Sequence, residues 1–226
     1  MRVLFIGNSY TFYNQMPEML AGIARTEGQN WTVDSVTKGG WDFERFCRPG
    51  SEMYAPLAEK LREEWNVIFM QEQSYRPVSD RENFLTGAAG VRAMMGPDVP
   101  RVILYVTWGR NDPHPLLAEL GMTRTEMTAA LHDAYAEAAR RIDAELSDVG
   151  GAFAYVKAHS PETEIYHPDN SHPSPLGSYL AALIHYATIT GSLPQHSFCP
   201  AQIENPRDAE TMEQLACGYL AETKKI

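Results

Sequence analysis

Cysteine, positive charge and long apolar runs are all scarce in this sequence. Its three cysteines, Cys47, Cys199 and Cys217, are widely spaced and form no CxxC pair, so we expect neither a disulfide framework nor a zinc knuckle. Lysine and arginine number 19 against 29 aspartates and glutamates, which gives a formal net charge of -10. Such a chain, without a local cluster of basic residues, repels phosphate backbones and anionic membrane surfaces. We therefore expect neither nucleic acid nor membrane as a partner.

No segment reaches the roughly 18 apolar residues of a membrane-spanning helix. The apolar tract at residues 3–6 ends at Gly7 and is too short for the hydrophobic region of a signal peptide. We interpret it as a first strand and expect a cytoplasmic protein, with a secreted protein whose signal peptide has been removed as the alternative. The composition, 44% hydrophobic and 21% charged, is typical of a globular protein. A length of 226 residues without a linker or repeat predicts one domain over residues 1–226.

Short apolar runs alternate along the chain with segments of helical periodicity. The runs at 3–6, 31–37, 67–70, 102–107 and 152–156 predict strands, and apolar spacing predicts helices at 17–26, 54–65, 123–146, 173–190 and 209–220. Continuous apolar runs suit strands that are buried on both faces, and the alternation indicates βαβ units. We predict an α/β fold, a three-layer α/β/α sandwich with a five-stranded parallel sheet.

In such folds, ligands bind at the carboxyl ends of the strands. Two residues, Gly7 and Asn8, separate the first predicted strand from Ser9, where a helix begins. The free N–H groups and the dipole of a helix start favour negative charge, which suits a nucleophile and an oxyanion. Taken alone, the segment favours the simpler interpretation of Ser9 as a cap or turn residue.

A second polar segment, Asp169 to Pro173, precedes a predicted helix. A serine nucleophile needs a base, and the imidazole that serves as base needs a carboxylate to hold its tautomer. Asp169 lies three residues before His172, so one turn can place both side chains on the same side. The alternative is an ordinary helix start, with Asp169 as its cap and His172 on the surface.

Potential oxyanion donors follow the second and third predicted strands. Gly39-Gly40 can bring a backbone N–H close to a ligand, although a plain turn explains the pair equally well. Gln71-Glu72-Gln73-Ser74 offers amide side chains that can donate to a developing oxyanion. Jointly, these segments supply a nucleophile, a base, an orienting carboxylate and oxyanion donors.

These segments resemble the sequence blocks of SGNH/GDSL hydrolases. FIGNSYT resembles the first block, with Asn8 where aspartate is commoner, Gly39-Gly40 resembles the second, and DNSHPS resembles the last, DxxH. The resemblance runs from residue 5 to about 180, and VIFMQEQS and HPSPLGSYLAA are similar to a bacterial branch of that superfamily. It implies a flavodoxin-like fold and a serine esterase with Ser9, Asp169 and His172 as its triad. It also implies no metal or organic cofactor, and a small-molecule ester as substrate, with acetylated carbohydrates as a common target.

The third block departs from the pattern of that family, which places Gly-x-Asn-Asp after the third strand and uses its asparagine as an oxyanion donor. Here Gly109-Arg110-Asn111-Asp112 follows the fourth predicted strand. The donor must lie beside Ser9 and Gly40, and neighbouring strand ends satisfy this condition. We therefore expect Gln73 to take the role of the asparagine, with Asn111 as the alternative.

Aromatic residues also follow the predicted strand ends. We expect Trp41, Tyr75 and Trp108 to bind substrate, because aromatic faces beside polar groups suit sugar rings, whereas Phe12 and Phe43 are expected to pack in the core. The sequence has no long apolar surface stretch that would form a lipid-binding lid. Short acyl groups are therefore favoured.

Two other functions stay open. His167, Asp169 and His172, with His114 near another strand end, include ligand types that bind zinc, but their spacing matches no strong motif and leaves Ser9 unexplained. A carbohydrate-binding protein of the same fold with weak catalysis is the other alternative, against which the intact serine, aspartate and histidine argue. The sequence contains no Gly-x-Ser-x-Gly nucleophile elbow around Ser9, and no GxGxxG or Walker phosphate-binding loop.

Overall fold

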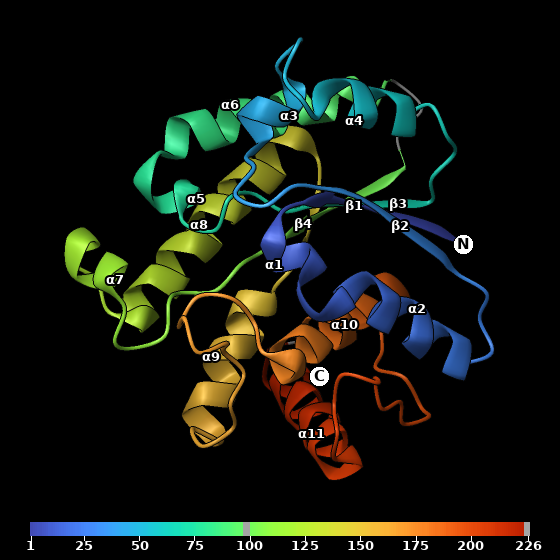
Figure 1. Cartoon of the computed structure of the whole chain (residues 1–226), viewed down its shortest axis with the longest axis vertical. Coiled ribbons are helices and arrows are strands. Elements are labelled where there is room, and N and C mark those ends of the chain that lie inside the picture. The colour runs from blue at the N-terminus through green and yellow to red at the C-terminus, as the bar shows by residue number, and fades with distance from the viewer. Residues whose placement is uncertain (97–99, 224–226) are drawn as a thin grey trace.

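The computed structural model describes residues 1–96 and 100–223 and has a central parallel sheet between two layers of helices (Figure 1). The strands are β1 (Arg2–Gly7), β2 (Thr32–Thr37), β3 (Val67–Met70), β4 (Arg101–Tyr105) and β5 (Glu145–Ser147). Their order in the sheet is β2-β1-β3-β4-β5, and all neighbours pair in parallel. The predicted α/β/α sandwich with a five-stranded parallel sheet is therefore confirmed.

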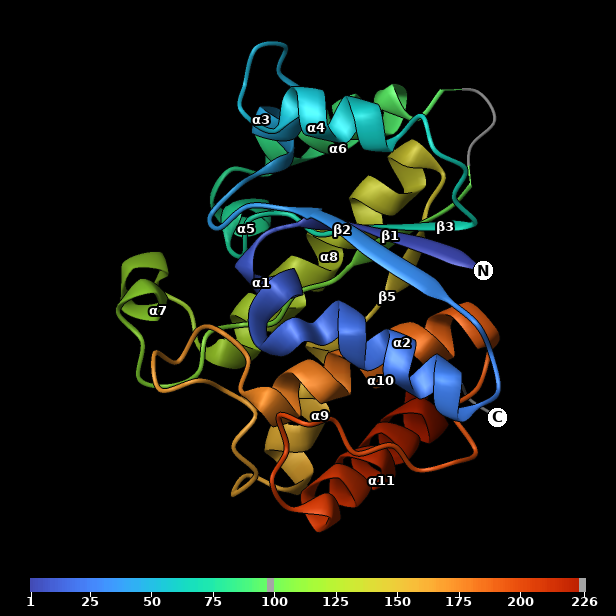
Figure 2. The ribbon, with the colours of Figure 1, turned by 45° about the vertical axis from the view of Figure 1, so that its right-hand side comes forward.

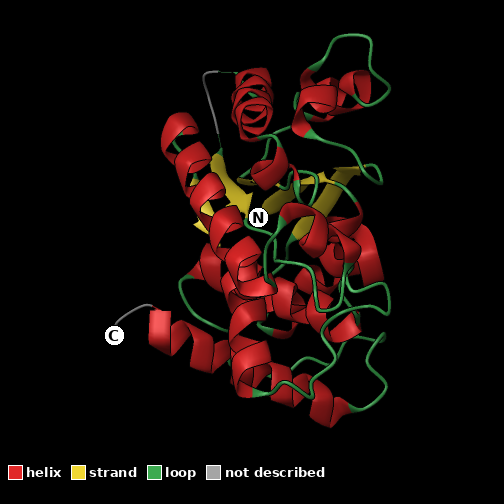
Figure 3. Cartoon of the chain, turned by 90° about the vertical axis from the view of Figure 1, so that its left-hand side faces the viewer, coloured by secondary structure: helices red, strands yellow, loops and turns green. Residues whose placement is uncertain are grey.

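Helices lie on both faces of the sheet. Their bounds are α1 (Ser9–Phe12), α2 (Met16–Thr26), α3 (Phe43–Cys47), α4 (Tyr54–Lys60), α5 (Arg76–Ser79), α6 (Arg81–Met94), α7 (Pro115–Leu120), α8 (Arg124–Ile142), α9 (Val149–His159), α10 (Pro175–Thr190) and α11 (Pro206–Thr223), with a 3₁₀ turn, η1, at Tyr13–Gln15. Helices α3, α4 and α6 cover one face, and α2, α9, α10 and α11 cover the other (Figure 2). An edge view shows the strands enclosed between the two layers (Figure 3).

The alternation of side chains along β1 explains why both faces of the sheet are covered. Val3 and Phe5 point into the core beneath α2 and α10, whereas Leu4 and Ile6 point into the core beneath α3 and α6. All four are fully buried. Because neighbouring residues of a strand face opposite sides, a continuous apolar run has to be covered on both faces to leave water.

The segment from residue 143 to 159 corrects one prediction. Residues 152–156, expected to form the fifth strand, lie within helix α9, and β5 is instead the short segment Glu145–Ser147. The buried residues of α9 include Val149, Ala152, Phe153 and Val156, which is helical spacing. A short apolar run does not distinguish a strand from a buried helix, so the sequence pattern was misleading here.

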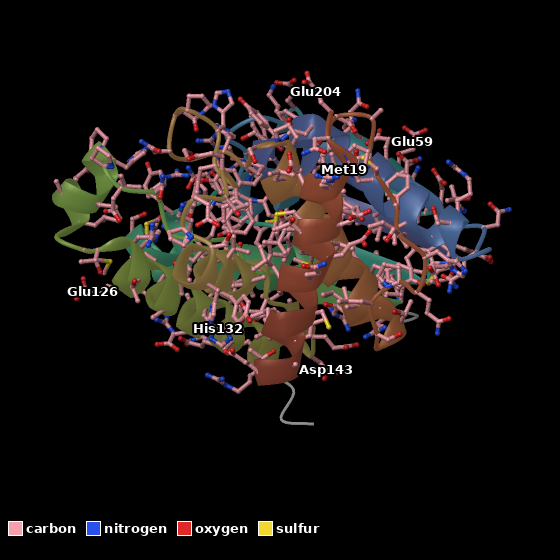
Figure 4. All side chains as sticks on the ribbon, turned by 90° about the horizontal axis from the view of Figure 1, so that it is seen from below. Met19, Glu59, Glu126, His132, Asp143 and Glu204 are labelled. Atoms are coloured by element: carbon pink, nitrogen blue, oxygen red, sulfur yellow. The ribbon has the colours of Figure 1, made fainter. Side chains whose placement is uncertain are left out.

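Helix α8 ends earlier than its expected limit at residue 146. The capping box of Thr123 and Glu126 is present at its start, as the sequence predicts, and Asp143, with a φ of 53°, ends it in a left-handed conformation. Figure 4 labels Glu126 and Asp143 near the two ends of this helix. The early end releases the chain for β5. The predicted helix at 54–65 also ends early, at Lys60.

The strand order places the loops after β2, β1 and β3 next to one another, since β1 pairs with both other strands. Asn8, directly after β1, links all three loops. Its backbone N–H donates to Gln71 Oε1 at 3.0 Å, and its side-chain amide donates to the carbonyl of Trp41 at 3.0 Å. Among the described residues, the structure has no helix whose length and apolar character would let it cross a bilayer.

Close packing at the start of α9 yields a stability prediction. A Cβ atom at Gly150 would collide with the carbonyl oxygen of Thr107, which is backbone, whereas one at Gly218 would meet the hydroxyl end of Tyr155, which is a movable side chain. We expect Gly150→Ala to lower the free energy of unfolding by about 1–3 kcal/mol. Gly218→Ala should cost far less, because the Tyr155 side chain can move aside while the preference of helices for alanine over glycine, roughly 1 kcal/mol, offsets the remaining cost. Urea unfolding of both variants tests this, and equal losses would contradict the packing described.

Candidate active site

Three side chains that are far apart in the sequence form one chain of hydrogen bonds. Ser9 is the first residue of α1, and its Oγ lies 2.9 Å from His172 Nε2. His172 Nδ1 lies 2.6 Å from Asp169 Oδ2. The structure thus brings together a hydroxyl, an imidazole and a carboxylate in the order that nucleophilic catalysis by serine requires.

The carboxylate of Asp169 is held in its ionised form. Burial raises its pKa, but the hydrogen bonds from the His172 ring and from the backbone N–H groups of His172 and Ser171 outweigh burial, so the pKa lies below its usual range. Those backbone N–H groups each donate to Oδ1 at 2.9 Å. An ionised Asp169 accepts the Nδ1 proton of His172 and leaves Nε2 free to accept the proton of Ser9.

Ser171 fastens the segment that carries Asp169 and His172. Its hydroxyl lies 3.0 Å from the Tyr10 hydroxyl and accepts a hydrogen bond from Arg110, and its carbonyl accepts from Trp108 Nε1 at 3.0 Å. Tyr10, Trp108 and Arg110 are all buried. Because buried polar groups form hydrogen bonds that are costly to lose, these contacts fix the segment against the end of β4.

The Gly-x-Asn-Asp motif at residues 109–112 also holds the segment that carries Asp169 and His172. The backbone N–H of Asn111 donates to the carbonyl of Asn170 at 2.9 Å, and its Nδ2 donates to Asn170 Oδ1 at 3.0 Å. Asn111 Oδ1 accepts from Arg124 at 3.1 Å. The amide of Asn111 is therefore directed at Asn170, the residue after Asp169. There it stabilises the segment that carries His172.

The two expected oxyanion donors border the same cavity, whose volume is about 400 Å³. Its lining residues are Gly40, Asp42, Arg45, Gln73, Tyr75, Arg76, Ser79 and Asp80. Gly40 has a φ of 68°, and the position of its absent Cβ faces open space. Gln73 Oε1 accepts the N–H groups of Tyr75 at 3.2 Å and Arg76 at 3.1 Å. These bonds occupy the oxygen of the side chain and leave its NH₂ group as the available donor.

The aromatic residues that we expected to bind substrate have different environments. Trp108 is fully buried, with its ring stacked on Tyr10 at 4.6 Å and on Phe153 at 4.0 Å between centroids. This corrects the expectation that Trp108 binds substrate, since its ring is enclosed by protein. Trp41 is half-buried, with the Lys38 ammonium 4.7 Å from its ring centroid. Tyr75 lines the cavity.

Tyr13 is a site residue that the sequence reasoning missed. Its ring stacks on the imidazole of His172, with centroids 4.2 Å apart and planes 13° apart. The sequence offered one signal for this role: Tyr13 lies four residues after Ser9, just beyond a predicted helix start. The neighbouring Phe12, expected in the core, is 40% exposed, whereas Phe43 is fully buried as expected.

The alternative metal site is not assembled. His167 Nδ1 lies 3.3 Å from Asp169 Oδ2, but both ring nitrogens of His172 are engaged by Asp169 and Ser9. His114 Nδ1 accepts the N–H of Leu116 at the start of α7. Within residues 1–96 and 100–223, no group of three histidine, cysteine, aspartate or glutamate side chains is arranged to hold a metal ion.

The hydrogen bonds of Asp169 predict a dependence of stability on pH. A carboxyl group whose pKa is lowered in the native state stabilises that state above its usual pKa of 3.8, and this contribution is lost as the pH falls through the native pKa. We expect Asp169→Asn to lower the unfolding temperature at pH 6, and the difference from the wild type to shrink toward pH 3. Asp133→Asn, at an exposed position, is the control, and a difference independent of pH would contradict the assignment.

Comparisons with known proteins identify relatives by structure. No family model matches the chain, and the search of curated proteins found no match. A candidate SGNH hydrolase from Slackia heliotrinireducens is 32% identical, covers 84% of this chain and 98% of its own, and superposes with a TM-score of 0.72.

Two further solved structures share the fold at lower identity. A DUF4886 family protein from Bacteroides uniformis is 16% identical over 100% of this chain and 96% of its own, with a TM-score of 0.80. The acetyl xylan esterase AlAXEase is 14% identical over 84% of this chain and 100% of its own, with a TM-score of 0.64. With the fold, the site and the first relative in agreement, this chain belongs to the SGNH/GDSL superfamily of hydrolases and has its flavodoxin-like fold.

Proposed function

We propose that this protein hydrolyses carboxylic esters through a covalent acyl-enzyme, with Ser9 as the nucleophile. The observation that carries the proposal is the unbroken hydrogen-bond chain from Ser9 through His172 to Asp169, at 2.9 and 2.6 Å. A binding protein has no need of an activated hydroxyl. The geometry therefore favours catalysis over the alternative of a carbohydrate-binding protein of this fold.

The reaction follows from the roles of these three groups. Ser9 Oγ attacks the carbonyl carbon of the ester while its proton passes to His172 Nε2, which gives a tetrahedral oxyanion and an imidazolium. When the oxyanion collapses, the bond to the alcohol oxygen breaks and His172 returns the proton to that oxygen. Water then attacks the acyl-enzyme by the same route, with His172 first as base and then as acid. Asp169 keeps the imidazole oriented and stabilises its charge.

Three donors for the oxyanion are proposed: the backbone N–H groups of Ser9 and Gly40 and the side-chain NH₂ of Gln73. The Ser9 N–H is at the first position of α1, where no intrahelical acceptor exists. The other two follow β2 and β3, which flank β1 in the sheet. Asn111 follows β4, one strand farther away, and its amide is bonded to Asn170.

The cavity beside Gly40 and Gln73 favours small, polar esters. Arginine and aspartate side chains, the Ser79 hydroxyl and the Tyr75 ring line it, and a long acyl chain finds no apolar channel there. An aromatic face beside hydrogen-bonding groups suits a sugar ring. We propose short-acyl esters of polar alcohols, such as acetylated carbohydrates, as substrates, and the activity named for AlAXEase is consistent with this class.

Removal of the nucleophile tests the proposed function. We expect Ser9→Ala to reduce kcat for p-nitrophenyl acetate by at least about 10⁴-fold, because the substitution removes the hydroxyl that contacts the base His172. Ser192→Ala, at an exposed position, should keep wild-type rates, and circular dichroism should show the same fold for both variants. Undiminished hydrolysis by Ser9→Ala would refute the mechanism. Binding of acetylated oligosaccharides without turnover by the wild type would favour the binding-protein alternative.

Paired variants separate the two candidate amide donors. We expect Gln73→Ala to lower kcat by about 10²–10³-fold with little change in KM, because a group that contacts only the oxyanion acts in the transition state. Asn111→Ala should have a smaller effect, through loosening of the Asn170 segment. Steady-state kinetics with one short-acyl ester measures both, and a larger loss of kcat for Asn111→Ala than for Gln73→Ala would reverse the assignment.

A further inference from the structure

A buried carboxyl group lies directly behind the proposed oxyanion donors, and the mechanism above gives it no part. Glu72 follows β3, immediately before Gln73, and is fully buried. Its Oε1 accepts the backbone N–H of Gln73 at 2.6 Å. Its two carboxyl oxygens lie 3.3 and 3.2 Å from the backbone N–H of Phe43. Such burial without a partner of opposite charge is costly, so the group needs an explanation.

These contacts connect the two loops that hold the donors. Phe43 is the first residue of α3 and follows Gly40 by three residues, while Gln73 is itself a proposed donor. The carboxyl group of Glu72 therefore links the loop after β2 to the loop after β3, on opposite sides of the strand that leads to Ser9. The link joins a residue three positions after Gly40 to the backbone of Gln73.

The backbone of Glu72 is also fixed. Its N–H donates to the Tyr135 hydroxyl of helix α8 at 3.1 Å, and its carbonyl accepts from Gln71 Nε2. Gln71 Oε1 in turn accepts the N–H of Asn8, the residue before the nucleophile. The backbone of Glu72 thus belongs to a buried hydrogen-bond network that reaches Asn8, the residue before Ser9.

One arginine and three carboxylates form a cluster of ion pairs beside Glu72. Arg76 of helix α5 donates to Asp42 at 2.5 Å and to Glu44 at 2.7 Å, and contacts Asp80 at 3.3 Å. The pKa of Glu72 is raised to about 8, chiefly by burial and also by the Asp42 charge, while its two N–H donors and the Arg76 charge lower it. Tyr135 is buried with its own pKa raised well above its usual range. Glu72 is therefore mostly protonated at neutral pH.

We propose that Glu72 is a positioning residue which, in its neutral form, holds the two oxyanion donors in place, and that loss of its proton switches the site off. This inference rests on the proposed function, because it concerns the oxyanion of that reaction. A carboxylate behind Gly40 and Gln73 would add a full negative charge next to the place where a second one develops. At the low effective dielectric of a buried site, like charges repel strongly. The rate should therefore fall as Glu72 ionises.

The dependence of kcat on pH tests this role. For the wild type, we expect kcat for a short-acyl ester to fall about tenfold between pH 7 and pH 9, as the protonated fraction of a group with a pKa of about 8 declines. Glu72→Gln keeps the shape of the neutral acid and cannot ionise, so its kcat should be flat over that range. Rates measured with Ser9→Ala supply the background. Glu82→Gln, at an exposed position, is the matched control and should keep the wild-type profile.

A second variant is expected to shift the pH at which kcat falls, whereas Glu72→Gln is expected to abolish the fall. Arg76→Gln takes away the positive charge that lowers the pKa of Glu72, so the fall in kcat should shift to higher pH. A purely structural role for Glu72 would leave the midpoint unchanged. This measurement keeps the inference testable if Glu72→Gln does not fold.

Thermal unfolding provides a readout that does not depend on activity. A carboxyl group whose pKa is raised in the native state contributes stability that is complete below its usual pKa of 4.5 and lost as the pH rises through about 8. The unfolding temperature of Glu72→Gln should therefore gain on the wild type as the pH rises from 5 to 8.5.

The outcomes separate the inference from the function on which it rests. Full activity of Ser9→Ala refutes both. If Ser9→Ala is inactive while Glu72→Gln keeps the wild-type fall in kcat, the role of Glu72 alone is refuted. An inactive Ser9→Ala, a flat profile for Glu72→Gln and a shifted one for Arg76→Gln would together support it.

Discussion

The attachment of residues 169–172 to the end of β4 is the constraint on which the candidate site depends. Ser9 and His172 are 163 positions apart in the sequence, yet their side chains are within hydrogen-bond distance. The short segment between Asp169 and His172 is fixed because buried side chains bond to Ser171 and the Asn111 backbone bonds to Asn170. Without these bonds the imidazole would sample many positions, and an imidazole that is displaced by 1 Å is a poor base. Rigidity of this segment is thus the condition for activation of Ser9.

Arg110 shows how charge contributes to that rigidity. It is buried, and its guanidinium bonds to the hydroxyls of Ser74 and Ser171. It thereby joins the loop after β3, which carries Gln73, to the loop that carries His172. Burial lowers its pKa to about 10, so it stays cationic at neutral pH and attracts the nearby Asp169 carboxylate. A single side chain therefore connects the proposed oxyanion loop to the acid–base loop.

Much of the fold could be predicted from the sequence, because it depends on local patterns. The three side chains of the site were predicted from polar residues at strand ends together with the resemblance to SGNH/GDSL hydrolases. The buried runs that form β1, β3 and β4 follow from continuous apolar residues, and polar residues at strand ends identify the candidate site by the general rule for parallel sheets. The loops that carry Asn8, Gly40 and Gln73 lie side by side because the strands before them are neighbours in the sheet. Right-handed βαβ connections leave few alternative strand orders.

Most of the misses concern tertiary packing, which no local pattern contains. Trp108 follows a strand end as a substrate-binding residue would, but its ring fills the space between Tyr10 and Phe153. The stacking of Tyr13 on His172 requires two distant segments to meet. The helix that contains residues 152–156 differs, because its signals are local: the Asp148 side chain accepts from the Gly151 N–H at its start, and its buried residues have helical spacing. A short apolar run alone does not distinguish it from a strand. Glu72 resembled an ordinary loop residue until its burial was known.

The central claim is that Ser9 forms an acyl-enzyme whose oxyanion is held by the loops after β2 and β3. The most direct measurement is a crystal structure of the protein after reaction with a fluorophosphonate, whose phosphorus mimics the tetrahedral carbon. We predict a covalent bond to Ser9 Oγ, with the phosphoryl oxygen in hydrogen-bond contact with the Gly40 N–H and the Gln73 side chain. Attachment to another residue, or a phosphoryl oxygen directed at Asn111 and away from Gly40, would contradict the account.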